Sequence, residues 1–86
     1  LARYGGEEFL ICFPQTDAAS AAGLCDQLRR AVQSADWPAL APGIAVTLSA
    51  GIAALQPGFS RSVLLNLADS RLYKAKHAGR NLVVMT

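Results

Sequence analysis

Two adjacent glycines followed by two adjacent carboxylates form the segment Gly5-Gly6-Glu7-Glu8-Phe9 near the start of the chain. A Gly-Gly pair between apolar segments is typical of a tight hairpin, where the backbone takes positive φ and a bulky ligand can approach the main chain. Carboxylate oxygens beside exposed backbone amides suit a magnesium ion that carries a polyphosphate. A plain hairpin with two solvated glutamates explains the same residues, so the segment alone leaves both interpretations open.

Two cations, Lys76 and Arg80, are four residues apart near the other end of the chain, with Lys74 close by. Cations are common at helix C-termini because they interact favourably with the helix macrodipole and the free carbonyls. The functional alternative is a phosphate clamp, in which an ammonium and a planar guanidinium hold the same triphosphate. Spacing alone favours the helix-end interpretation.

The hydrophobic pattern predicts the elements that must position these groups. The apolar run Phe9–Phe13 does not alternate, which indicates a strand covered on both faces and paired through the Gly-Gly turn with residues 1–4. Thr16 or Asp17 is the predicted cap of a helix that ends near Ala35 and carries Arg29 and Arg30 on a solvated face. A loop broken by prolines and glycines is expected to follow.

A strand and a second helix are predicted in the other half of the chain. Residues Ile44–Ala53 alternate as a strand does, and Gly51 within them indicates a bulge or a close backbone contact. Ser60 is the predicted cap of a helix that Gly79 ends in a left-handed conformation. The predicted order is strand, strand, helix, strand, helix, strand, with the last strand at residues 82–85.

The composition indicates one small globular domain. The chain has 86 residues, of which 52% are hydrophobic, and a net charge of +2 that is too weak to predict binding to nucleic acid or to a membrane surface. No apolar run approaches the length that spans a bilayer. Cys12 and Cys25 lack metal-ligand spacing, so we expect two buried free thiols in a reducing, cytoplasmic compartment.

Three segments resemble the signatures of GGDEF domains, the diguanylate cyclases. The first, Arg3-Tyr4-Gly5-Gly6-Glu7-Glu8-Phe9, is similar to the family motif in its form with Glu at the third position. Residues 68–81 are similar to AD-x-ALY-x-AK-x-x-GRN, except that Arg71 replaces a small residue, and residues 46–53 resemble VT-x-S-x-G-(I/V)-A. The matches follow the family order and cover nearly the whole chain.

The resemblance implies an α+β fold, the ferredoxin-like nucleotide-cyclase palm, with an antiparallel sheet and helices on one face. Residues 1–86 would be the C-terminal portion of a single GGDEF domain, truncated so that the first strand and first helix precede Leu1. That strand would lie between Phe9–Phe13 and Ile44–Ala53, and its absence would expose unpaired edges. We expect strand exchange between copies, direct closure of the gap, or upstream residues that fill it.

The resemblance also implies a reaction in which a homodimer joins two GTP molecules into cyclic di-GMP and releases pyrophosphate. Mg²⁺ or Mn²⁺ would be the cofactor, and a sensory domain would precede the segment, which would be inactive when isolated. The implied site residues are catalytic Glu7 and Glu8, with Glu7 as metal ligand, and nucleotide-binding Gly5, Gly6, Lys76 and Arg80. Two alternatives remain open: a non-catalytic module that binds GTP or cyclic di-GMP to regulate an attached domain, and a purely structural dimerisation segment.

Overall fold

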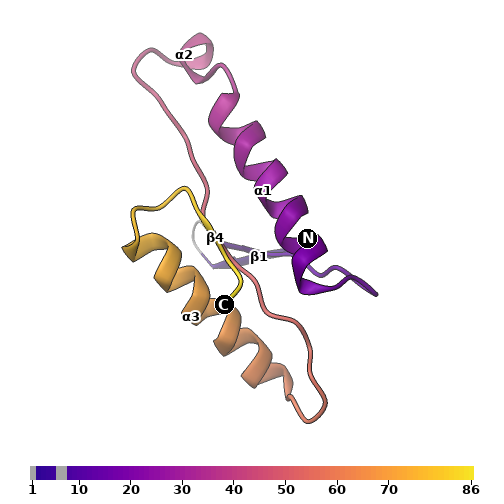
Figure 1. The fold of residues 1–86 in the computed structure, drawn as a ribbon. Helices are drawn as coiled ribbons and strands as arrows, with labels where there is room; N and C mark the ends of the chain where they lie inside the picture. The colour runs from indigo at the N-terminus through magenta and orange to yellow at the C-terminus, as the bar shows by residue number, and fades with distance from the viewer. Residues whose placement is uncertain (1, 6–7) are drawn as a thin grey trace.

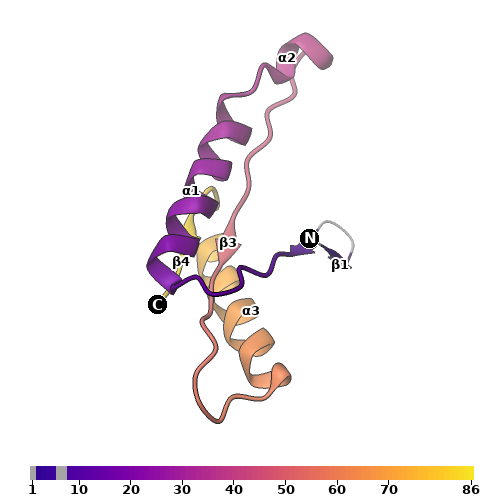
Figure 2. The same cartoon turned by 90° about the vertical axis from the view of Figure 1, so that its right-hand side faces the viewer.

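The computed structural model describes the backbone of residues 2–5 and all atoms of residues 8–86. The elements are β1 (Ala2–Gly5), β2 (Glu8–Leu10), α1 (Ala18–Ser34), α2 (Trp37–Leu40), β3 (Ala50–Gly51), α3 (Arg61–His77) and β4 (Val83–Val84). The two long helices lie on either side of the short β3–β4 ladder (Figure 1). The β1–β2 hairpin projects away from this body (Figure 2).

The first long helix begins and ends where the sequence predicts. The Asp17 side chain caps α1 by accepting a hydrogen bond from the backbone N–H of Ser20 at 2.7 Å, and Ala35 is the C-cap. Within α1, Ala21 and Cys25 are buried, as the helical spacing of the apolar residues requires.

The Asp17 cap makes the first turn of α1 sensitive to acid. The pKa of Asp17 is lowered, chiefly because the carboxylate accepts the Ser20 hydrogen bond. A lowered folded-state pKa contributes stability above the unfolded pKa, and this contribution is lost as the pH falls through the folded pKa. We therefore expect the amide protection of Ser20 to fall as the pH drops below the ordinary value of 3.8. The Asp17→Asn variant keeps a capping oxygen that does not titrate, so an equal loss in that variant would contradict the prediction.

The second long helix ends in a left-handed turn. The Ser60 hydroxyl caps its start by accepting from the backbone N–H of Val63 at 3.1 Å. After its end, φ is +116° at Gly79, +62° at Arg80 and +53° at Asn81. Glycine adopts such angles freely, but a non-glycine residue in this region costs about 1 kcal/mol or more and needs support from its surroundings. The predicted helix and its glycine stop are confirmed.

The strands form two separate pairs. β1 pairs with β2 antiparallel, and β3 pairs with β4 in parallel through only two residues of each strand. The prediction of a single antiparallel sheet is therefore wrong for the described residues, and direct closure between β2 and β3 does not occur. The predicted strand at residues 44–53 is paired only at Ala50–Gly51, because its partner strand β4 is itself only two residues long.

The helices cover opposite faces of the β3–β4 ladder, which corrects the prediction that they share one face. Side chains alternate along a strand, so neighbouring residues of β3 face opposite ways. Ala50 and Ile52 pack in the cluster that contains Ala21 and Cys25 of α1. Gly51 lies between them in sequence and faces α3, so close to its backbone that a Cβ atom would meet the carbonyl of Ala68 and the amide of Leu72. The predicted close backbone contact at Gly51 is confirmed.

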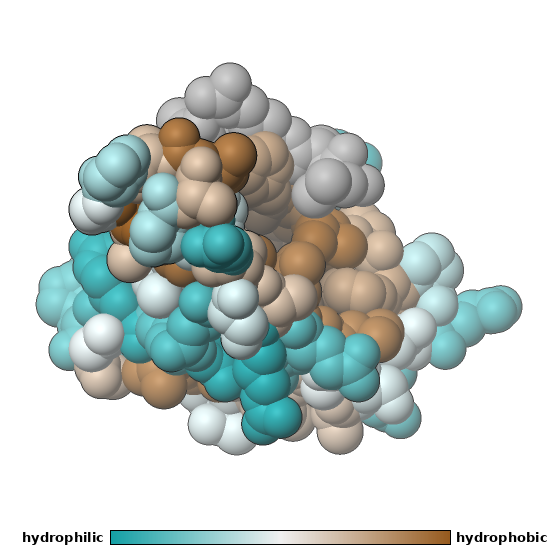
Figure 3. Space-filling view, turned by 90° about the horizontal axis from the view of Figure 1, so that it is seen from above, coloured by the Kyte–Doolittle hydropathy of each residue, from teal (hydrophilic) through white to brown (hydrophobic). Residues whose placement is uncertain are grey.

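The buried core is small, and a large cleft opens beside it. Among residues 8–86 the buried hydrophobic side chains are Ala21, Cys25, Ile52 and Ala75. An open cleft of about 1740 Å³ extends from β2 across α1 and β3 to α3. The view from above shows hydrophobic side chains around a hollow (Figure 3).

The open cleft explains why two predictions of burial are wrong. Phe9 is 63% exposed, and Cys12 is an exposed free thiol, although both were expected in a strand covered on two faces. The segment leaves its ladder after Leu10 and borders the cleft without a further covering layer. Among the helices of the described part, none has the length and apolar composition needed to cross a bilayer.

Candidate functional site

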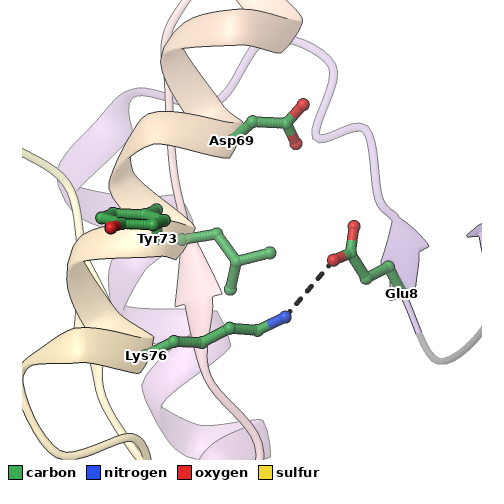
Figure 4. A pocket seen from close by; sticks show the side chains of 5 residues that line it. Glu8, Asp69, Tyr73 and Lys76 are labelled. Carbon is green, nitrogen blue, oxygen red and sulfur yellow. Dashed lines mark hydrogen bonds and ion pairs between the residues drawn. The ribbon is translucent and has the colours of Figure 1, made fainter.

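A small pocket brings the two ends of the chain together. It has a volume of about 260 Å³ and is lined by Glu8, Asp69, Leu72, Tyr73 and Lys76. Glu8 reaches it from β2, and the other residues come from α3, as Figure 4 shows. The Lys76 ammonium lies 3.3 Å from Oε2 of Glu8 and donates a hydrogen bond to it. Residues that are 68 positions apart in the sequence therefore share one site.

The Glu8–Lys76 ion pair leaves capacity for another ligand. The two side chains are 38% and 27% exposed, so water screens their attraction. Ion pairs of this kind contribute about 0–1 kcal/mol. An ammonium has three donors, and the pair with Glu8 occupies one of them. Lys76 can therefore bind an anionic ligand by adding contacts or by exchanging its weak partner.

Asp69 and Tyr73 line the pocket, although the sequence predicts no role at a site for either residue. They lie on the same helical face as Lys76, at positions i, i+4 and i+7, which is the signal that places them at one pocket. The Tyr73 ring stacks on His77 with a centroid distance of 3.8 Å. Asp69 lies opposite Glu8 and adds a second carboxylate to the pocket.

Arg80 borders the large cleft together with Lys76, but it does not line the small pocket. Its backbone N–H donates to the carbonyl of Ala75 at 3.0 Å, which fixes the left-handed turn to the end of α3. Lys74 differs from both, because its ammonium lies 3.4 Å from the carbonyl of Thr86. The cleft therefore receives Lys76 and Arg80, while Lys74 interacts elsewhere.

Three predicted site residues belong to the hairpin turn. Gly5 ends β1, where it is the register partner of Glu8. Gly6 and Glu7 lie outside the described residues, so the roles predicted for them stay predictions.

Arg29 is not on a solvated face, which corrects a prediction. Its side chain is only 16% exposed, and Nε lies 2.7 Å from Oδ1 of Asp26. Its Nη1 donates to Oδ1 of Asn81 at 3.0 Å and to Oε1 of Gln33 at 3.1 Å. Arg30, at 72% exposure, is solvated as predicted. The pKa of Asp26 is lowered, first of all by the hydrogen bond from Arg29.

The sequence profile of the family described as "Diguanylate cyclase, GGDEF domain" matches residues 1–82. The chain belongs to the GGDEF family. The match includes both segments that meet at the small pocket, Glu8 at one end and residues 69–76 at the other.

Two of three curated relatives of this GGDEF chain are named diguanylate cyclases, and the third is named a response regulator. It is 35% identical over 81 residues to diguanylate cyclase DgcP of Pseudomonas aeruginosa, covering 94% of this chain and 12% of that protein. It is 38% identical over 86 residues to response regulator PleD of Caulobacter vibrioides, covering 95% and 19%. It is 33% identical over 86 residues to diguanylate cyclase A of Treponema denticola, covering 99% and 23%. The chain thus spans less than a quarter of the length of these relatives.

The described part of this GGDEF chain supplies oxygen donors but no complete metal site. Glu8 and Asp69 border one pocket, and carboxylate oxygens are the donors that hard divalent cations prefer. Within residues 8–86, no three His, Cys, Asp or Glu side chains form a group that could hold a metal ion. The donor type therefore fits a divalent cation, and a full set requires further ligands.

Arg71 is the residue that departs from the family motif. Its Nη1 donates to the carbonyl of Ile52 at 2.6 Å, and its buried Nε has no partner among residues 8–86. The larger side chain thus ties α3 to the end of β3.

Proposed function

We propose that the protein carrying this chain is a diguanylate cyclase that joins two GTP molecules into cyclic di-GMP and releases pyrophosphate. The observation that carries the proposal is the meeting of Glu8 and Lys76, which belong to two separate family motifs, at one pocket. The names of the curated relatives support the same activity.

In the proposed reaction, the 3′-hydroxyl of each GTP attacks the α-phosphorus of the other, and pyrophosphate leaves. Each GTP is held by one of two subunits, so the active species is a homodimer. Lys76 and Arg80 bind phosphate oxygens, and Gly5 and Gly6 leave room for the nucleotide beside the hairpin. Cations at these positions stabilise the negative charge that develops on the transferring group.

The carboxylates have separate roles in this proposal. Glu8 accepts a hydrogen bond from Lys76 when no nucleotide is bound. When a phosphate oxygen takes the place of Glu8 as the partner of the Lys76 ammonium, Glu8 takes part in catalysis. Glu7 is proposed as a catalytic residue and as ligand of Mg²⁺ or Mn²⁺. GGDEF diguanylate cyclases generally use divalent metal ions, which neutralise phosphate charge and lower the pKa of the attacking hydroxyl.

We also propose that residues 1–86 form one portion of a single GGDEF domain and that the large cleft receives an upstream strand and helix. The support is the apolar lining of the cleft and the separation of the two strand pairs that border it. Unpaired edges are satisfied when another strand pairs with them. The chain spans only a small share of the length of its curated relatives, which is consistent with a regulatory domain elsewhere in the polypeptide. Two free cysteines fit a cytoplasmic location.

The test is to incubate the full-length protein with GTP and Mg²⁺ and to identify products by mass spectrometry. We expect one cyclic di-GMP and two pyrophosphates for two GTP consumed, and loss of both products in the Glu7→Gln variant. GTP or cyclic di-GMP binding without synthesis would instead support the non-catalytic regulatory module. Absence of binding and synthesis in a folded protein would rule out both functions.

A further inference from the structure

A chain of hydrogen bonds connects α1 to the turn that carries Arg80. Arg29 is at its centre, because its guanidinium joins Asp26 of the same helix to the side chain of Asn81, 52 residues away in the sequence. The backbone N–H of Asn81 in turn donates to the hydroxyl of Ser49 at 2.9 Å. Asn81 is therefore held by its side chain from α1 and by its backbone from the segment before β3.

The turn depends on these contacts for its shape. Arg80 and Asn81 both have positive φ, and residues other than glycine keep such angles only where the surroundings determine them. The backbone of Arg80 is bonded to Ala75 of α3. Asn81 follows Arg80 in the chain, and its side-chain oxygen accepts a hydrogen bond from Arg29. The direction of the Arg80 side chain therefore depends on a turn that Arg29 supports.

Arg29 is itself prepared for this contact. Asp26 lies 2.7 Å from its Nε, and Gln33 accepts from the same nitrogen that reaches Asn81. A planar guanidinium held by partners on its own helix loses little further freedom when it bonds the turn. The neighbouring Arg30 also contacts Asp26, at 3.0 Å, but it is exposed and makes no bond to the turn.

We propose that Arg29 is a positioning residue of the nucleotide site, which acts through Asn81 to hold Arg80 in the left-handed conformation that directs its guanidinium to the cleft. The inference rests on the proposed function in one respect, namely that Arg80 binds the nucleotide. It assigns Arg29 no contact with the substrate. If Arg29 were purely structural, it would stabilise the packing of α1, and the effect of replacing it would not depend on whether Arg80 is present.

A double-mutant cycle in the full-length protein separates these roles. Arg29→Ala is expected to weaken GTP binding about tenfold, because a misplaced Arg80 loses part of a charged hydrogen bond that contributes about 10- to 100-fold to affinity. In the Arg80→Ala background, Arg29→Ala is expected to have no further effect on GTP affinity, because the residue it positions is absent. Arg30→Ala removes the same charge from the same helix and is expected to leave affinity within about twofold, as exposed ion pairs contribute little. Additive effects of Arg29→Ala and Arg80→Ala would overturn the proposal.

Hydrogen exchange without nucleotide gives a second readout that does not depend on the proposed function. Arg29→Ala and Arg29→Lys are both expected to speed amide exchange at residues 79–82 while residues 61–77 stay protected, since lysine keeps the charge but not the planar fork. Unchanged exchange at the turn in both variants would overturn the proposal. If the wild-type protein binds no GTP, the proposed function fails, and this exchange measurement still decides whether Arg29 holds the turn. If Arg29→Ala does not fold, Arg29→Lys carries both measurements.

Discussion

Replacing Lys76 with alanine is expected to weaken GTP binding by about 10- to 100-fold. A hydrogen bond to a charged group contributes about 1.5–3 kcal/mol, and each 1.4 kcal/mol corresponds to a factor of ten in affinity. Among the described residues Lys76 uses one of its three donors, in an ion pair with Glu8 that is too solvated to hold it against a triphosphate. The loss should therefore approach the full strength of the phosphate contact. Titration calorimetry of the full-length protein with GTP measures it.

Lys74→Ala is the matched control. It removes the same charge from the same helical turn, but the Lys74 ammonium reaches the carbonyl of Thr86 and not the pocket. An exposed charge that makes no contact with the pocket contributes little and is screened by salt, so we expect little change in affinity. Equal affinities of a folded Lys76→Ala variant and the wild-type protein would favour the helix-end interpretation of this cation, which the sequence spacing alone also permits.

The helices could be predicted because their signals are local. Asp17 and Ser60 cap them through bonds to residues three positions on, and Gly79 supplies the left-handed stop. The short helix α2 lies in the segment that the prolines and glycines predict to be a loop. Proline is tolerated at the first turn of a helix, where its missing N–H is not needed, and the indole of Trp37 donates to the carbonyl of Val32 at 2.6 Å.

The sheet and part of the site could not be predicted because they depend on partners far away in the sequence. Alternation over residues 44–53 indicates a strand but does not say that β4 pairs with only two of its residues. Helical periodicity places Arg29 among polar residues of α1, yet the burial of its side chain depends on Asn81 in another element. The family resemblance alone predicts that Glu8 and Lys76 belong to one site, and it does not predict the ion pair between them.

Replacing Gly51 with alanine is expected to destabilise the domain by about 3 kcal/mol or more, at the upper end of the cost of overpacking. The new Cβ would meet the carbonyl of Ala68 and the amide of Leu72, and it would lie 2.8 Å from the carbonyl carbon of Arg71. These are backbone atoms of α3, so no side-chain rotation can relieve the contact. The helix must move away from β3, which also displaces Lys76 and should abolish GTP binding at the small pocket.

Gly23→Ala makes the same chemical change but is expected to stabilise the domain instead of destabilising it. Gly23 lies inside α1, and an added Cβ meets nothing within 4 Å. Alanine there restricts the unfolded chain and should stabilise the helix by about 0.5–1 kcal/mol. Hydrogen exchange in the full-length protein measures both effects: residues 18–34 report on Gly23→Ala, and residues 61–77 report on Gly51→Ala. If Gly51→Ala left the protection of α3 unchanged, the close packing of β3 on this helix would be wrong, and with it the support that holds Asp69 and Lys76 opposite Glu8.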